Sequence, residues 1–122
     1  KMAKVLCIDD DETVARLIAE VVEFCGHTAV IETNSIEAAT THLRDSQIAA
    51  ILTDYMMPQL DGIDLLTIWQ EQRPQVRRVL ITAAPNEAPV KVAGRSGLAQ
   101  MVVAKPPSIA DVKLAVAWLA QD

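Results

Sequence analysis

The sequence lacks the features that mark several classes of protein. No apolar run approaches the roughly 20 residues of a membrane-spanning helix, and no signal-peptide pattern opens the chain, so we expect a cytoplasmic protein without membrane contact. Basic residues are few, 11 against 16 acidic ones, and the formal net charge is -5. Such a surface attracts polyanions poorly, which argues against direct nucleic-acid binding.

Cysteine is scarce as well. Cys7 and Cys25 lie in apolar stretches and do not have the spacing of metal ligands. We expect free, buried thiols in a reducing compartment, without a zinc site or a disulfide framework. The 122 residues contain no linker, repeat or low-complexity segment, so we expect one domain spanning residues 1–122.

Short apolar runs alternate with longer amphipathic ones along the chain. Five runs rich in Val and Ile predict β-strands. They are apolar throughout, without in–out alternation, which indicates a sheet covered on both faces, as parallel sheets are. The runs are Lys4–Ile8, Thr28–Glu32, Ala49–Thr53, Arg78–Thr82 and Met101–Ala104.

Helical patterns fill the intervals between the strands. Apolar residues recur at helical spacing from Val14 to Cys25, and Gly26 ends that helix. The alternation, (βα)₅, predicts an α/β fold with one doubly wound five-stranded parallel sheet. The second helix is expected from the capping pair Asn34 and Glu37 to about Asp45, and the third from Asp61 and Asp64 to before Pro74. Pro85 and Pro89 bracket a short fourth helical segment that starts late, and Ser108 caps the last helix.

Polar residues follow four of the five predicted strands, at the edge where such sheets bind ligands. Converging carboxylates repel one another unless a cation joins them, and oxygen ligands without Cys or His indicate Mg²⁺ or Mn²⁺. A hydroxyl and a lysine suit a tetrahedral anion, so the set predicts phosphoryl transfer to an aspartate. The residues are Asp9, Asp10 and Asp11 after the first strand, Asp54 after the third, Thr82 ending the fourth and Lys105 after the fifth.

Four segments, VLCIDDDETV, AAILTDYMMPQLDGIDLL, VLITAA and VVAKP, resemble response-regulator receiver domains in order and approximate spacing. The resemblance spans Val5 to about Leu119, and its most specific part is the D-x-M-M-P-x-x-D-G run that begins at Asp54. It implies a flavodoxin-like fold with strand order 2-1-3-4-5. It also implies a phospho-acceptor switch of two-component signalling, which is not a conventional enzyme and takes its phosphoryl group from a histidine kinase or a phosphotransfer protein.

The resemblance assigns a role to each pocket residue. It also implies a cis peptide bond between Lys105 and Pro106. The metal ion, Mg²⁺ or Mn²⁺, would be held by Asp9, Asp10, the phospho-acceptor Asp54 and the backbone carbonyl of Met56. The phosphoryl group would be bound by Thr82, the backbone N–H of Ala83 and Lys105.

The sequence departs from the family pattern outside the pocket. Val102 stands three positions before the lysine, where receivers commonly carry an aromatic residue. Pro85 and Pro89 lie where the fourth helix usually starts, and Pro107 follows Lys105-Pro106 where an apolar aromatic residue is frequent. We therefore expect an intact pocket and an altered route from the pocket to the surface.

Two other functions remain open from the sequence. Asp9, Asp11 and Thr13 form the D-x-D-x-T motif of haloacid-dehalogenase-type phosphatases, with Asp9 as nucleophile and Asp11 as acid/base. That family also needs a late acidic pair, and the fourth strand here ends without one. The second alternative is a receiver fold that acts as an unphosphorylated interaction module.

The last helix suggests an interface. With Ile109, Val112, Val116 and Leu119 on its inner face, a turn of about 100° per residue puts Leu114 and Trp118 on the outer side. Trp is enriched in interface hot spots, so we expect these two residues to contact a second copy or an output partner, more so after phosphorylation.

Overall fold

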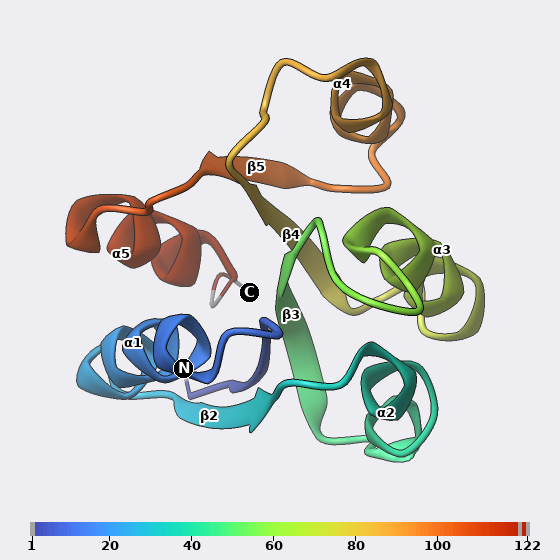
Figure 1. Cartoon of the computed structure of the whole chain (residues 1–122). Helices are drawn as coiled ribbons and strands as arrows, with labels where there is room; N and C mark the ends of the chain where they lie inside the picture. The colour runs from blue at the N-terminus through green and yellow to red at the C-terminus, as the bar shows by residue number, and fades with distance from the viewer. Residues whose placement is uncertain (1, 120, 122) are drawn as a thin grey trace.

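A five-stranded parallel sheet forms the centre of the molecule in the computed structural model, which describes residues 2–119 and 121. The strand order is β2-β1-β3-β4-β5, so the expected flavodoxin-like topology is confirmed (Figure 1). Each predicted strand is present within one residue of its expected bounds. The strands are β1 (Lys4–Ile8), β2 (Thr28–Glu32), β3 (Ile48–Asp54), β4 (Arg77–Thr82) and β5 (Met101–Ala104).

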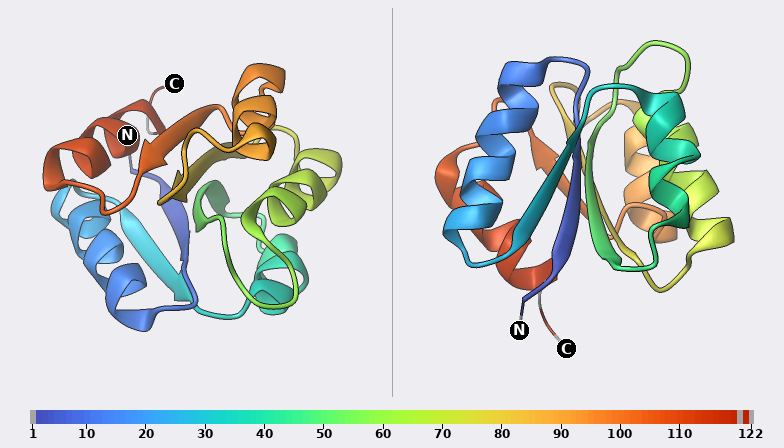
Figure 2. Two further views of the ribbon diagram at one scale, coloured as in Figure 1. Left: turned by 45° about the horizontal axis from the view of Figure 1, so that its top comes forward. Right: turned by 90° about the horizontal axis from the view of Figure 1, so that it is seen from below.

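Helices cover both faces of the sheet, as the uninterrupted apolar strands predict (Figure 2). One core lies between the sheet and the helices α1 (Glu12–Phe24) and α5 (Ile109–Leu119). The other lies beneath α2, α3 and α4. No described helix is long and apolar enough to span a bilayer. The helices of the second face are α2 (Ser35–Ala39), α3 (Gly62–Gln72) and α4 (Ala88–Ser96), with a 3₁₀ turn at His42–Arg44.

Capping residues set where the helices begin. The side chains of Asp11, Asn34 and Asp61 accept hydrogen bonds from backbone N–H groups in the first turns of α1, α2 and α3. The Ser108 hydroxyl accepts one from the Asp111 N–H at 3.0 Å, which confirms the expected start of α5. At the other end of α1, Gly26 has a φ of +91°, the left-handed conformation that glycine tolerates after a helix.

The predicted second helix is shorter than expected. It ends at Ala39 and does not continue to Asp45. Thr40 leaves the helical region with φ −124° and ψ −77°, and its hydroxyl donates to the Ile36 carbonyl at 2.7 Å. This local bond and two successive β-branched residues, Thr40 and Thr41, favour an end to the helix over another turn.

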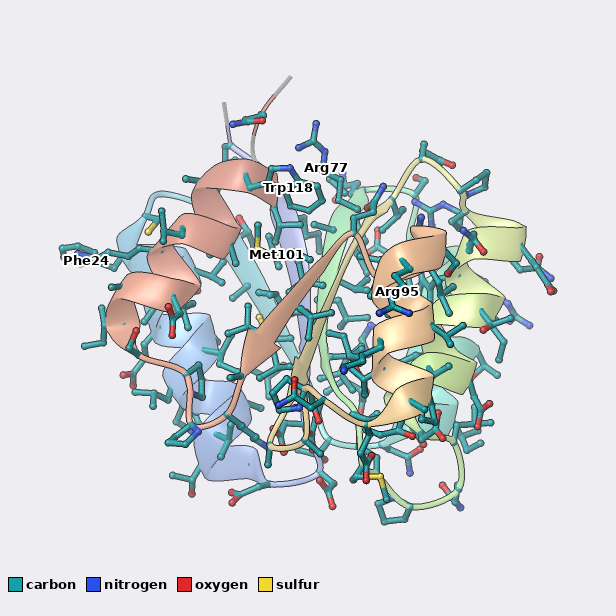
Figure 3. The ribbon with its side chains drawn as sticks, turned by 90° about the horizontal axis from the view of Figure 1, so that it is seen from above. Phe24, Arg77, Arg95, Met101 and Trp118 are labelled. Carbon is teal, nitrogen blue, oxygen red and sulfur yellow. The ribbon has the colours of Figure 1, made fainter. Side chains whose placement is uncertain are left out.

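The faces of α5 also differ from the helical-wheel expectation. Ile109, expected inside, is 61% exposed, whereas Leu114 is 68% exposed as expected. Trp118, expected outside, is partly buried and packs against the α1–α5 core. The guanidinium of Arg77 lies 5.1 Å from the centre of its ring, and Arg77 also donates to the Trp118 carbonyl (Figure 3). The end of α5 converges on the start of β4 there, so Trp118 does not form an open patch with Leu114.

Candidate functional site

The sheet brings the predicted pocket residues to one edge because its parallel strands end there together. Asp54 is the last residue of β3 and pairs in register with Ile81, which precedes Thr82 at the end of β4. Asp9 and Lys105 follow the last residues of β1 and β5. The peptide bond between Lys105 and Pro106 is cis, as the resemblance implies.

Three carboxylates form the centre of the site. Oxygen atoms of Asp9, Asp10 and Asp54 lie within 4.8 Å of one another. Asp9 and Asp54 are buried and Asp10 is exposed, so the cluster opens to solvent on the Asp10 side. A set of carboxylate oxygens without a thiolate or an imidazole matches the ligand preference of Mg²⁺ or Mn²⁺. The residues present therefore fit a hard divalent cation.

Lys105 supplies the positive charge of the site. Its ammonium lies 2.8 Å from Oδ2 of Asp9 and 3.2 Å from Oδ1 of Asp54. Burial disfavours the charged lysine, but the hydrogen bond to Asp9 and the nearby carboxylate charges outweigh that effect and raise the pKa of Lys105. The lysine is therefore cationic when the pocket is ready to bind an anion.

Asp54 has two different carboxylate oxygens. Its Oδ1 accepts from the Tyr55 N–H at 2.9 Å and pairs with Lys105. Its Oδ2 enters no hydrogen bond with the described residues, among which every buried polar side-chain atom has a partner, so Oδ2 is open to solvent. Burial, and then the charge of Asp9, raise the pKa of Asp54, while Lys105 opposes them.

The remaining predicted residues flank the carboxylates. Thr82 is buried, and its hydroxyl oxygen accepts from the Ala84 N–H at 2.9 Å, which leaves the hydroxyl proton available to a ligand. The Thr82 carbonyl accepts from the Lys105 N–H at 2.8 Å and so links the ends of β4 and β5. Within the described chain, neither the Met56 carbonyl nor the Ala83 N–H forms a hydrogen bond. Both residues are exposed.

The residues of the phosphatase motif have other tasks here. Asp11 accepts from the Thr13 N–H at 3.0 Å and caps α1. Both oxygens of Asp9 are engaged, Oδ1 by the Asp11 N–H at 2.9 Å and Oδ2 by Lys105. Asp9 thus has no free oxygen for nucleophilic attack, and Asp11 serves as a helix cap.

Two residues to which the sequence analysis assigned no role hold the loop after Asp54. A Cβ on Gly62 would lie 2.2 Å from the Asp54 carbonyl oxygen, so only glycine allows this close approach. Ser35, at the start of α2, donates to the Pro58 carbonyl at 2.8 Å and accepts from the Leu60 N–H at 3.2 Å. The Asp-Gly pair of the motif signals the first residue, but no sequence pattern signals a contact 23 residues away.

Comparison with known proteins agrees with this geometry. The chain is 26% identical over 116 residues to a chemotaxis protein CheY homolog of Campylobacter jejuni, covering 91% of this chain and 88% of the relative. It is 33% identical over 86 residues to the transcriptional regulatory protein CpxR of Escherichia coli, covering 70% of this chain and 36% of that protein. The structure of the Francisella response regulator 1452 receiver domain superposes with a TM-score of 0.83 at 29% identity, over 96% of this chain and 95% of that one.

The family comparison covers almost the whole chain. Residues 5–117 match the model of the response regulator receiver domain. The match includes every predicted pocket residue, from Asp9 to Lys105, and both residues that hold the loop after Asp54. The chain therefore belongs to the response regulator receiver domain family of two-component signalling.

Proposed function

We propose that the chain is a phospho-acceptor switch in which Asp54 receives a phosphoryl group from a histidine kinase or a phosphotransfer protein. The observation that supports this most directly is the asymmetry of the Asp54 carboxylate. One oxygen is held by a backbone N–H and Lys105, and the other is open to solvent. An anchored carboxylate with one free oxygen is prepared for nucleophilic attack.

The transfer needs a divalent cation, Mg²⁺ or Mn²⁺. Its ligands would be Asp9, Asp10, Asp54 and the Met56 carbonyl, which no hydrogen bond among the described residues occupies. When bound, the ion neutralises charge on the phosphoryl oxygens and offsets the repulsion among the carboxylates.

The residues of the chain carry out the remaining steps. The free oxygen of Asp54 forms a bond to phosphorus while the bond from phosphorus to the donor imidazole nitrogen breaks, and the electron pair remains on that nitrogen, which takes up a proton. Lys105 moves its charge to a phosphoryl oxygen, and the Thr82 hydroxyl and the Ala83 N–H donate hydrogen bonds to the others. The domain thus takes part in its own phosphorylation and dephosphorylation and turns over no separate substrate.

The new charge has a direct route to the surface. Phosphorylation replaces the single negative charge of the Asp54 carboxylate with nearly two on the phosphoryl group, and recruitment of Thr82 pulls on the link between β4 and β5. Beside β5 lies a groove of about 310 Å³ lined by Met101–Ala104, Asp111 and the exposed Leu114. We place the output partner of this cytoplasmic switch in that groove.

The test is phosphorylation by acetyl phosphate with Mg²⁺, followed by intact-protein mass spectrometry. We expect the wild type to gain one phosphoryl group and Asp54→Asn to gain none. Asp54→Asn should fold normally with equal or greater thermal stability, because it removes one charge from a repulsive cluster. Asp64→Asn, an exposed position in α3, is the matched control and should behave as the wild type.

Each other outcome contradicts the proposal. Uptake by Asp54→Asn would mean that another residue is the acceptor. Absence of uptake by the wild type, also from a phosphorylated donor protein, would favour the unphosphorylated interaction module. Steady turnover of a phosphate ester would favour the phosphatase.

A further inference from the structure

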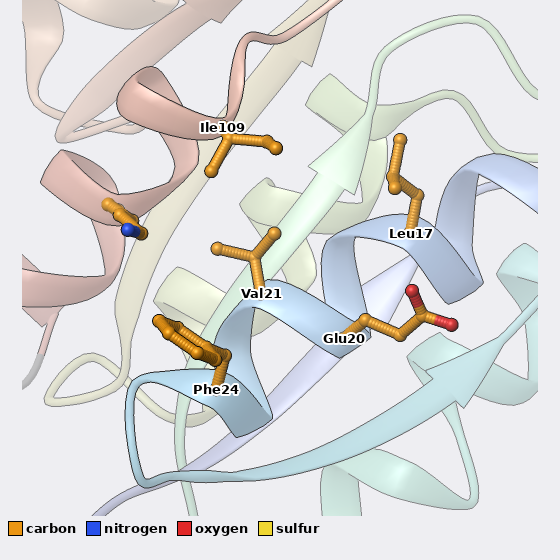
Figure 4. A pocket seen from close by; sticks show the side chains of 6 residues that line it. Leu17, Glu20, Val21, Phe24 and Ile109 are labelled. Carbon is orange, nitrogen blue, oxygen red and sulfur yellow. The ribbon is translucent and has the colours of Figure 1, made fainter.

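A second apolar groove lies between α1 and α5, separate from the acceptor pocket and from the groove beside β5. Its volume is about 380 Å³. Leu17, Val21 and Phe24 line it from α1 and Ile109 lines it from α5, with their side chains around one hollow (Figure 4). Glu20 of α1 and Lys113 of α5 complete the lining. We call these six residues the α1–α5 surface.

The apolar residues of this surface are unusually open for their type. Phe24 is 79% exposed, Ile109 61% and Leu17 50%, although other residues of the same helices, among them Ile18, Val22 and Val112, are buried in the core. Single exposed apolar residues are common, but these three line one hollow. The ammonium of Lys113 lies 5.1 Å from the centre of the Phe24 ring and shields only part of it.

Charge distinguishes the two walls of the hollow. Glu20 stands on the α1 wall and Lys113 on the α5 wall. In the part of the chain that the structure describes, neither residue belongs to an ion pair; the ion pair of α1 joins Glu12 and Arg16 instead. The surface therefore carries one unpaired charge of each sign on opposite sides of an apolar centre.

We propose that the α1–α5 surface binds a second copy of this chain. In a twofold interface, a residue i that meets j of the partner is matched by j meeting i. A twofold axis through the hollow places Glu20 of each copy against Lys113 of the other, with the apolar residues between them. A patch with opposite charges on opposite walls is thus complementary to itself, whereas a partner of one charge sign would oppose one of the two walls.

The size of the surface sets the strength of the dimer. Stable complexes bury about 800 Å² on each partner, and three exposed apolar side chains supply only part of that area. We expect a weak dimer in rapid exchange, populated at submillimolar concentration and weakened by salt, because two of its contacts are ion pairs near solvent.

Charge reversal gives a sharp test by sedimentation velocity. The Glu20→Lys variant carries two positive groups on the surface and the Lys113→Glu variant two negative groups, so each should self-associate about tenfold or more weakly than the wild type. An equimolar mixture of the two should recover association, because every charge then meets its opposite in a heterodimer. The controls Glu71→Lys in α3 and Lys91→Glu in α4 change the same net charge at exposed positions and should associate like the wild type.

Several outcomes would overturn the proposal. A wild type that stays monomeric at submillimolar concentration would do so, and so would a mixture that remains monomeric while the wild type dimerises. Loss of the dimer in Leu114→Glu but not in Phe24→Glu would assign self-association to the groove beside β5. All these results are independent of phosphate uptake at Asp54.

Discussion

Gly62 is the residue on which the position of the Asp54 backbone most directly depends. Its N–H donates to the Tyr55 carbonyl at 2.6 Å, and a Cβ there would lie 2.2 Å from the Asp54 carbonyl oxygen and 2.9 Å from Cδ1 of Leu80. The nearest of these atoms belongs to the backbone of the central strand, which cannot move aside easily. The constraint is spatial and does not come from a left-handed φ.

We predict that Gly62→Ala lowers the free energy of unfolding by about 1–3 kcal/mol, the usual cost of overpacking, and slows phosphorylation. Urea denaturation and acetyl phosphate labelling measure the two effects. Gly94→Ala in α4 is the control, because its new Cβ would meet only Cγ2 of Val102 at 3.6 Å. Removing a helix glycine should stabilise the protein there by about 0.5–1 kcal/mol. If both variants changed the free energy of unfolding in the same direction, the close approach at Gly62 would not be the constraint.

The two thiols differ in environment, and their reactivity should differ with it. Burial, and then the charge of Glu23, raise the pKa of Cys7 to about 12, whereas Cys25 is partly exposed. At pH 8 we expect Ellman's reagent to label Cys25 quickly and Cys7 only after unfolding. The Cys25→Ser variant should lose the fast phase and Cys7→Ser should keep it; fast labelling of both thiols in the native protein would contradict this.

The same pKa shift predicts the direction of a pH effect. The folded state holds the Cys7 proton up to about pH 12, because burial raises the pKa of the thiol, and the unfolded thiol loses the proton near its ordinary pKa of 9.0. Between these values the unfolded state binds fewer protons, so stability falls as pH rises. Cys7→Ser should reduce that fall in alkaline urea titrations.

Hydrogen bonds of the Ser35 side chain join α2 to the loop after β3. This side chain is 3% exposed and bonds both Pro58 and Leu60, on either side of Gln59, whose φ is +73°. A left-handed conformation is costly for a residue other than glycine, so contacts on both sides must hold it. The segment between Asp54 and α3, which includes Met56, is thereby fixed at its tip.

We predict that Ser35→Ala costs about 0.5–1.5 kcal/mol of stability and weakens Mg²⁺ binding, because the Pro58 carbonyl and the Leu60 N–H, which also bond each other at 2.9 Å, lose the side chain that ties them to α2. Thr40→Ala, at the C-terminal end of the same helix, is the matched control, since its hydroxyl bonds only the Ile36 carbonyl of α2. Isothermal titration with Mg²⁺ separates the two variants. Unchanged Mg²⁺ affinity in Ser35→Ala would show that the contact supports the fold alone.

Elements were predictable where one local signal dominates. Continuous apolar runs give every strand within one residue, and capping residues such as Asp61 give the helix starts. The predicted end of α2 was wrong because the Thr40 hydroxyl bonds the Ile36 carbonyl and the chain turns there, which helical periodicity does not describe. The predicted exposure of Trp118 was wrong because the residue that packs on it, Arg77, lies 41 residues earlier in the sequence.

The candidate site could be predicted in composition but not in detail. A parallel sheet aligns its strand ends, so the grouping of Asp9, Asp54 and Lys105 follows from topology alone. The division of the Asp54 oxygens depends on the Tyr55 N–H and on distances within the pocket, which the sequence does not contain. For the same reason, the tie between Ser35 and the loop had no local signal.

The whole molecule carries a net charge of -5, and three of its carboxylates cluster at the acceptor pocket. The cluster contains three carboxylates and one lysine, so without a cation it opposes folding. An ion that binds only the folded state stabilises it by mass action, by about 1.4 kcal/mol at ten times its dissociation constant. We therefore predict that millimolar Mg²⁺ raises the melting temperature of the wild type by a few degrees, whereas NaCl of equal ionic strength does not.

Variants separate this effect from general charge screening. Asp10→Ala should melt higher than the wild type without metal, because it relieves repulsion, and should lose most of the gain from Mg²⁺. Asp111→Ala removes an exposed carboxylate of α5 outside the cluster and should keep the full gain. Differential scanning calorimetry of the three proteins, with and without Mg²⁺, measures both the melting temperature without metal and the gain on adding Mg²⁺. A wild-type melting temperature that ignores Mg²⁺, or an equal gain in Asp10→Ala, would mean that the carboxylate cluster does not hold the ion.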